Sequence, residues 1–148
     1  MSEKKIGALI VIEGRTPLGE IIASGNELDS SVTTPMLENI FFPKAPLHDG
    51  AVVIRDNRIH SAGCILPLSQ SSLSLELGTR HRAALGVSEM SDALVVVVSE
   101  ETGKISVAHN GTLERDMKFG ELTEFITSCL VNDENEKPRF FERARRKK

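Results

Sequence analysis

The chain lacks the residues that many nucleic-acid-binding proteins rely on. Its 148 residues include no Trp, no Tyr and only six Phe, so few aromatic side chains are available to stack on bases. The segment 132–148 holds seven Lys or Arg and four Asp or Glu, a net +3. Residues 1–131 therefore carry −6, within a formal total of −3. This acidic body argues against a nucleic-acid polymer as partner, so a local cluster of cations must hold any bound anion.

Cysteines and long apolar runs are also scarce. Cys64 and Cys129 are too few and too far apart for a zinc motif. Both lie in apolar runs, which predicts buried free thiols and fits a reducing cytoplasm. No stretch reaches the roughly 18 apolar residues of a spanning helix, and there is no signal peptide. The first expected strand begins almost at the start of the chain, so we expect a domain cut from a longer protein.

Hydrophobic patterning predicts one α/β domain. The composition, 40% apolar and 26% charged, is that of a soluble globular protein. Apolar or alternating runs predict strands over 6–12, 51–55, 58–66, 93–98 and 105–109, with turns at 56–57, 101–104 and 110–111. Helices are expected over 34–41, 79–90 and 119–130, with Thr34 and Thr79 as caps, and 16–26 is ambiguous.

These elements predict a central sheet of mixed parallel and antiparallel strands, flanked by helices. The expected domain covers residues 1–131. The apolar pattern stops there, so residues 132–148 are expected to form a charged, flexible tail.

A first group of candidate functional residues stands where a loop enters a strand. His48 and Asp49 precede Gly50, and the strand begins at Ala51. An Asp carboxylate is a hard oxygen ligand for Mg²⁺ or Mn²⁺, and it also accepts a proton from a hydroxyl. A glycine allows a ligand or another backbone to approach closely. Taken alone, however, the pattern is more often an ordinary Asp-Gly turn.

A second group opens the helix expected over 79–90. Thr79 is followed by Arg80, His81 and Arg82, which crowd three potential cations into the first helical turn. The helix dipole is already positive there, so each charge costs typically about 0.3–1 kcal/mol unless an anion binds. Free N–H groups, a hydroxyl and two guanidiniums make a phosphate cradle. A solvated helix end with tolerated charges is the simpler alternative, but we favour the functional interpretation.

A third group, Ser99-Glu100-Glu101, follows the buried run at 93–98. Ligands of α/β sheets gather where strands end, and two neighbouring acids can take a metal directly or through water. A polar hairpin tip also explains these residues and, when the group is taken alone, is the better explanation.

In this order, the three groups resemble the diadenylate cyclase domain family. The family's Asp-Gly-Ala and Arg-His-Arg motifs stand here at 49–51 and 80–82, and the flanks 46–48, 78–79 and 99–101 agree as well. The similarity covers about residues 6–130. It is greatest to the membrane-anchored cyclases of Gram-positive bacteria, whose transmembrane helices precede the domain. The resemblance therefore implies a cytoplasmic domain of a protein anchored in the membrane by helices that this chain lacks.

The resemblance implies a metal-dependent reaction in which two ATP molecules become cyclic di-AMP and two pyrophosphates. Each subunit of a homodimer, stable or transient, holds one ATP. The 3′-hydroxyl of each ATP attacks the α-phosphorus of the other, with Mn²⁺ or Mg²⁺ bound. The resemblance also implies two partners, a membrane-bound regulator and phosphoglucosamine mutase.

The same resemblance implies roles for individual residues. The metal would be bound by His48, Asp49 and Glu101, and Asp49 would also activate the hydroxyl. The role of Glu100 and Glu101 is the least defined, since these positions can be basic in the family. The catalytic set is Asp49, Arg80, His81 and Arg82. The ATP-binding set is Gly50, Ala51, Leu66, Gly78, Thr79, Arg80 and Ser99, with the backbone at Leu66 holding adenine.

Two other functions fit parts of the pattern. A nucleotide-sensing module without turnover would use the same phosphate cradle but would not need Asp49. A metal-dependent phosphohydrolase would usually show more clustered His and Asp ligands than His48 and Asp49 supply. The chain has no Walker-type glycine-rich loop, which excludes a P-loop protein.

Overall fold

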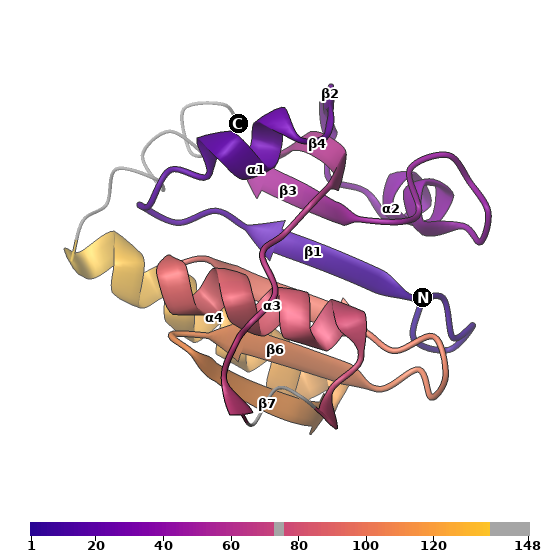
Figure 1. Cartoon of the computed structure of the whole chain (residues 1–148). Coiled ribbons are helices and arrows are strands. Elements are labelled where there is room, and N and C mark those ends of the chain that lie inside the picture. Colours follow the sequence, from indigo (N-terminus) through magenta and orange to yellow (C-terminus); the bar gives the residue numbers. More distant parts are fainter. Residues whose placement is uncertain (73–75, 137–148) are drawn as a thin grey trace.

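The computed structural model describes residues 1–72 and 76–136, with side chains as far as residue 130 outside that gap. A 7-stranded sheet in the order β2-β4-β3-β1-β5-β6-β7 forms the centre of the molecule (Figure 1). The strands are β1 Ala8–Ile12, β2 Asn26–Ser31, β3 Ala51–Arg55, β4 Arg58–Cys64, β5 Leu94–Val98, β6 Ile105–His109 and β7 Thr112–Met117. The helices are α1 Gly19–Ala23, α2 Thr34–Phe41, α3 Thr79–Met90 and α4 Phe119–Glu136.

The sheet is mixed, as the sequence predicts. β1 and β3 are parallel, and the other neighbouring pairs are antiparallel. It follows that β1, β3 and β6 begin at the same edge of the sheet at which β5 and β7 end. Residues that precede β1, β3 and β6 therefore lie close to residues that follow β5 and β7.

Helices cover both faces of the sheet (Figure 1). On one face, α1 and α3 pack against alternate residues of the central strands, such as Val95 and Val97. On the other face, α2 contributes Ile40 and Phe41 to one apolar cluster, and α4 packs on a neighbouring cluster around Val96. The near-continuous Val run of β5 is explained by this burial on both sides, because a strand buried on two faces needs no polar alternation.

Segment 67–69 crosses α3 in direct contact. A Cβ at Gly86 would overlap the carbonyl oxygen of Pro67, so glycine is needed where the two backbones meet. The amide of Ser69 donates a hydrogen bond of 3.0 Å to the carbonyl of Arg82. This contact ties the segment after β4 to the first turns of α3.

Most local predictions are confirmed. The predicted strand boundaries 51–55 and 105–109 agree with β3 and β6. Asn110 and Gly111 both have positive φ, 51° and 77°, as a tight hairpin requires. The stretch 16–26, which was ambiguous in the sequence, contains α1. The edge strand β2, which comes next, was not predicted. Both cysteines are free, but only Cys64 is buried.

The helix caps differ from the prediction. Thr33, rather than Thr34, caps α2, and its hydroxyl accepts a hydrogen bond of 3.2 Å from the amide of Met36. Gly78 rather than Thr79 occupies the cap position of α3, and a glycine has no side chain with which to cap the helix. The Thr79 hydroxyl is therefore not used as a cap.

The C-terminal helix is longer than expected. α4 continues to Glu136, beyond residue 131, where the apolar pattern stops. Residues 137–148 lie outside the described residues, so the flexibility predicted for the tail stays a prediction. Within the part of the chain that is described, no helix combines the length and hydropathy needed to span a membrane.

Candidate active site

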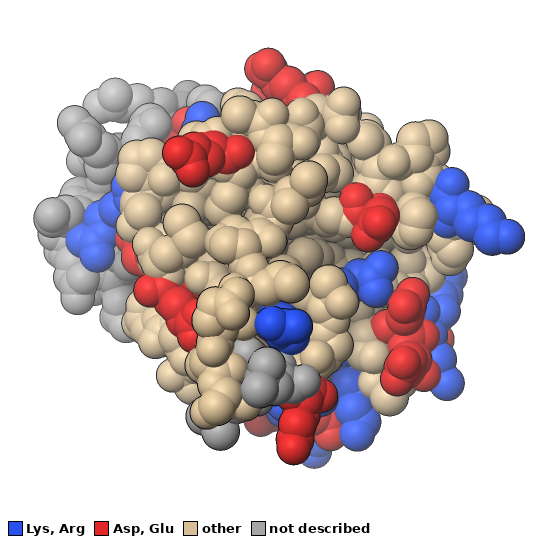
Figure 2. All heavy atoms as spheres, in the orientation of Figure 1, with Lys and Arg blue, Asp and Glu red and all other residues tan. Residues whose placement is uncertain are grey.

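A cleft of about 1010 Å³ opens at the edge of the sheet where β1, β3 and β6 begin. It brings together predicted functional residues from all three groups: His48, Asp49, Gly78, Thr79, Arg80, His81, Ser99 and Glu101. The predicted residues Gly50, Ala51, Leu66 and Arg82 do not line it. Figure 2 shows the side of the molecule that faces the viewer in Figure 1. Charged side chains of both signs gather toward its right and lower margins, and its centre is mostly uncharged.

The loop before β3 orients the imidazole of His48. Its Nδ1 lies 2.7 Å from the carbonyl oxygen of Ala45. A carbonyl can only accept, so Nδ1 carries the proton and, in the neutral ring, Nε2 has a free lone pair. This is the tautomer in which histidine binds a metal or accepts a proton. Asp49 follows directly and is exposed in the cleft.

Gly50 and Ala51 do not line the cleft. Instead, their packing against β4 fixes the position of Asp49, which precedes them. Gly50 has φ +125°, and a Cβ there would lie 2.8 Å from the carbonyl carbon of Gly63 and 2.9 Å from the Cys64 oxygen. Only glycine suits this backbone and this close approach to β4. Ala51 is fully buried and pairs with Cys64 in the sheet. Leu66 is likewise packed in the core beneath α3.

The two arginines at the start of α3 point in different directions. Nη1 of Arg80 lies 3.5 Å from Oε1 of Glu100, and Arg80 lines the cleft. In contrast, Nη2 of Arg82 donates a hydrogen bond of 3.3 Å to the carbonyl of Ser69. The buried Nε of Arg82 has no hydrogen-bond partner among the described residues. The Arg80 side chain therefore reaches the cleft, whereas that of Arg82 braces the 67–69 segment.

Ser99 organises the turn after β5. Its hydroxyl oxygen accepts hydrogen bonds from the amides of Glu101, at 3.2 Å, and Thr102, at 3.3 Å. Both contacts use lone pairs, so the hydroxyl proton remains able to donate toward the cleft. This turn fixes the positions from which Glu100 and Glu101 project.

Two further cations, Lys104 and Arg115, line the cleft, and motif analysis did not identify them. Arg115 lies on β7 at a bulge. Ile105 pairs with Met117 and Val107 pairs with Glu114, so β7 has an extra residue there, and Asp116 has φ +57°. Bulges re-aim side chains next to active sites. No local pattern in the sequence signals this bulge.

The remaining lining residues come from the same edges of the fold. Besides the two cations, the sequence analysis did not identify four polar or charged lining residues: Glu76, Thr102, Ser106 and Asp116. Their convergence depends on strand pairing, and in particular on Ser106 lying opposite the bulge of β7.

Comparison with known proteins identifies the family. The model of the DAC family, described as DisA bacterial checkpoint controller nucleotide-binding, matches residues 1–113. The chain belongs to this family. Arg115 lies just beyond the matched residues, so the family model does not account for it.

Relatives of the DAC domain support the same assignment. The chain is 50% identical over 127 residues to the cyclic di-AMP synthase CdaA of Bacillus subtilis, covering 85% of this chain and 46% of that protein. It is 48% identical over 142 residues to a diadenylate cyclase of Listeria monocytogenes, covering 95% and 52%. The chain thus spans about half the length of these relatives. A crystal structure of a DacA double mutant from Staphylococcus aureus matches with a TM-score of 0.83 at 47% identity, over 86% of each chain.

The donor atoms in the DAC cleft suit a divalent metal that also binds phosphates. The described residues contain no group of three or more His, Cys, Asp or Glu side chains placed to hold an ion by themselves. His48, Asp49 and Glu101 nevertheless line one cleft. Mg²⁺ is usually bound through one or two carboxylates together with substrate phosphates, so this sparse set fits that mode.

His81 of the DAC domain is expected to destabilise the fold at acidic pH. Burial, and then the charges of Arg115 and Arg80, lower its pKa below the ordinary value of 6.5. The unfolded chain takes up a proton near pH 6.5 while the folded chain does not, so stability falls as the pH drops through 6.5 toward the folded pKa. Urea unfolding at pH 7.5 and 5.5 should show a larger loss in the wild type than in His81→Gln. Equal losses would contradict this assignment.

Proposed function

We propose that this domain is a diadenylate cyclase that converts two ATP molecules into cyclic di-AMP and two pyrophosphates. One observation carries the proposal. The His48–Asp49 pair and the cationic start of α3 line the same cleft, in a chain 50% and 48% identical to proteins named cyclic di-AMP synthase and diadenylate cyclase. A carboxylate that accepts a proton and a cationic helix start that binds phosphate are the two parts this reaction needs.

The start of α3 would bind the phosphates. Gly78 provides no side-chain cap, so the first amides of the helix remain available to an anion. Arg80 adds a guanidinium that lies 3.5 Å from Glu100, at a distance where the pair is easily exchanged for a phosphate. His81, neutral near pH 7, can donate one ring N–H without adding charge to a site that already holds Arg80 and Arg115.

Asp49 would accept the proton of the attacking hydroxyl. The 3′-oxygen of one ATP forms a bond to the α-phosphorus of the other, and the bond from that phosphorus to the bridging oxygen breaks. The electron pair leaves with pyrophosphate, and the proton passes to Asp49 and then to solvent. A divalent metal held at His48, Asp49 and Glu101 would neutralise charge on the phosphates.

Two subunits are needed on this proposal. Cyclic di-AMP has two equivalent phosphodiester bonds, and one cleft that binds one ATP offers only a nucleophile or an electrophile. Two clefts that face each other with two-fold symmetry bring the nucleophile of each ATP against the electrophilic phosphorus of the other. Both bodies are acidic, so cations in the cleft must offset their repulsion, and the productive homodimer is expected to be weak.

Membrane anchoring of the longer protein belongs to the same proposal. A crystal structure of a hypothetical membrane spanning protein from Bacillus cereus matches with a TM-score of 0.75 at 53% identity, over 79% of this chain and 58% of that chain. This match supports attachment of the longer protein to a membrane, and the proposal places the domain on the cytoplasmic side. A membrane-bound regulator and phosphoglucosamine mutase are the partners to test by co-purification with the full-length protein.

Arg80→Ala and Arg82→Ala are expected to behave differently. Loss of the Arg80 guanidinium should weaken nucleotide binding by about tenfold or more, as expected for a charged hydrogen bond. The melting temperature should not fall, since a positive charge leaves the start of the helix. Arg82→Ala should lower the melting temperature, because it removes the contact with Ser69. Calorimetry with 3′-deoxy-ATP, which lacks the attacking hydroxyl, measures binding without turnover. Unchanged affinity in Arg80→Ala would refute the phosphate role.

A further inference from the structure

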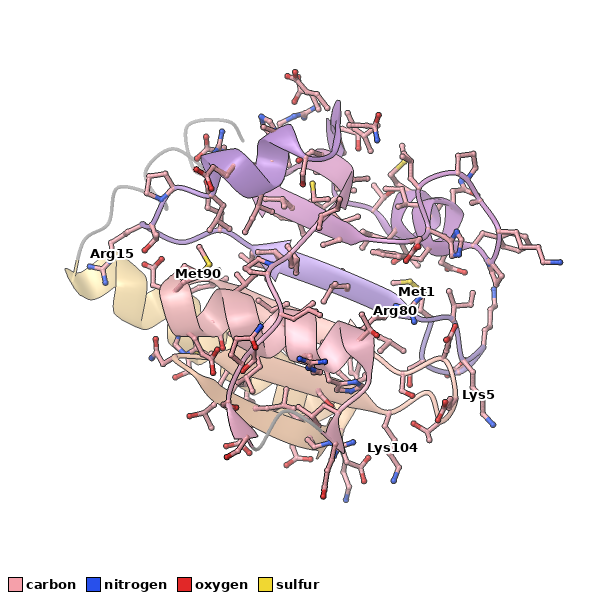
Figure 3. All side chains as sticks on the ribbon, in the orientation of Figure 1. Met1, Lys5, Arg15, Arg80, Met90 and Lys104 are labelled. Atoms are coloured by element: carbon pink, nitrogen blue, oxygen red, sulfur yellow. The ribbon has the colours of Figure 1, made fainter. Side chains whose placement is uncertain are left out.

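Gly7 lies directly against the guanidinium of Arg80. A Cβ at Gly7 would lie 2.8 Å from Cζ, 2.8 Å from Nη1 and 3.0 Å from Nη2 of that side chain. Nonbonded carbon atoms pack at about 3.5–4.0 Å, so the guanidinium occupies space that only a glycine leaves open. In Figure 3 the labelled Arg80 lies beside the start of β1, in agreement with its contact with Gly7.

The backbone at Gly7 is held on both sides. Before it, the amide of Ile6 donates a hydrogen bond of 3.0 Å to the carbonyl of Met1. After it, Ala8 pairs with Val98 in the antiparallel ladder of β1 and β5. Gly7 itself is buried, and its φ is not positive, so the backbone accepts an L-residue there. An added methyl group would therefore displace the end of the flexible Arg80 side chain rather than the strand.

The position of this contact links Gly7 to the cleft. Because Ala8 pairs with Val98, the residue before β1 lies beside the residues that follow β5. The Arg80 guanidinium fills this corner, against Gly7 on one side and 3.5 Å from Glu100 on the other. Neither Gly7 nor any residue of β1 lines the cleft, so Gly7 acts only through the space that its missing side chain leaves to Arg80.

We propose that Gly7 is a positioning residue, whose missing side chain seats the Arg80 guanidinium in the corner between β1 and β5. This inference rests on the proposed function, because the guanidinium so placed would meet the phosphates of a nucleotide. Gly7 acts through Arg80 and touches no substrate itself.

The test is a double-mutant cycle between Gly7→Ala and Arg80→Ala, with Gly19→Ala as the control. A Cβ at Gly19 would meet no atom within 4 Å. Calorimetry with 3′-deoxy-ATP and Mg²⁺, melting temperature and the rate of cyclic di-AMP formation are measured for each variant. Gly7→Ala should weaken binding about tenfold and slow turnover by up to about a hundredfold, as a 1 Å misplacement can. Gly19→Ala should behave as the wild type.

The second arm of the cycle separates positioning from general damage. In the Arg80→Ala background the space beside Gly7 is empty, so Gly7→Ala should have no further effect on binding. Any loss of melting temperature caused by Gly7→Ala alone should also disappear there.

Three outcomes would overturn the inference. In the first, Gly7→Ala binds and turns over as the wild type does, while Arg80→Ala is impaired. This refutes the role of Gly7 and leaves the proposed function standing. In the second, the defect of Gly7→Ala persists in the Arg80→Ala background, which assigns Gly7 to the strand alone. In the third, the wild type neither binds 3′-deoxy-ATP nor forms product, and the proposed function fails together with the inference.

Discussion

Asp49→Asn is expected to lower the rate of cyclic di-AMP formation by about 10²–10⁴-fold, the range that a general acid–base group contributes. The amide has the shape of the carboxylate but cannot accept the proton, and it is a poorer metal ligand. Asp49 is exposed in the loop before β3, so the melting temperature should change little. The rate is measured by chromatography of the nucleotide products.

Asp56→Asn is the matched control for this variant. Asp56 follows β3 at its opposite end and lies in the turn to β4, outside the cleft. The same change of charge is made there without touching the proposed site, so the rate should stay near that of the wild type. Near-normal product formation by Asp49→Asn would remove Asp49 from the mechanism, whatever the control shows.

Activity per molecule is expected to fall as the isolated domain is diluted. If two clefts must face each other, the rate per molecule is proportional to protein concentration below the dissociation constant of the dimer and levels off above it. A membrane anchor would raise the local concentration, and a free domain lacks that advantage. Specific activity measured across a wide range of protein concentration, with sedimentation under the same conditions, tests this. Constant activity per molecule from a species that sediments as a monomer during turnover would exclude the two-subunit mechanism.

Mixing wild type with excess Asp49→Asn extends this test. Most wild-type subunits would then pair with a variant subunit that binds ATP but cannot activate its hydroxyl. Such a pair forms one phosphodiester bond, so a linear dinucleotide that retains a triphosphate should accumulate. Asp56→Asn in the same excess should yield the cyclic product.

The sequence predicts the order of elements because most of them carry a local signal. The buried run of β5, the Asn110-Gly111 turn and the apolar stripe of α4 each follow from neighbouring residues alone. The edge strand β2 carries no such signal. It is mostly exposed and polar, and its register with β4 shifts between Glu27 and Ser30. Its strand conformation comes from pairing with β4, which is a tertiary effect.

The candidate site is only partly predictable from the sequence. Its three motifs stand at strand and helix ends, so the fold gathers them at one edge. Arg80 and Arg82 look equivalent in the sequence, but residues two apart on a helix do not face the same way, and only Arg80 lines the cleft. Arg115 depends on a bulge, and Gly7 depends on the path of a side chain from another element. Neither has a local signature.

The most direct test is to incubate the protein at high concentration with ATP and Mn²⁺ and to separate the nucleotides by chromatography. The proposed cyclase predicts cyclic di-AMP together with two pyrophosphates for each molecule formed, and product formation by the Asp49→Asn variant that is slower by about 10²–10⁴-fold. Conversion of ATP to ADP or AMP would identify a hydrolase, and unchanged ATP bound to the protein would identify a nucleotide sensor. Either result would contradict the assignment of cyclase activity to this cleft.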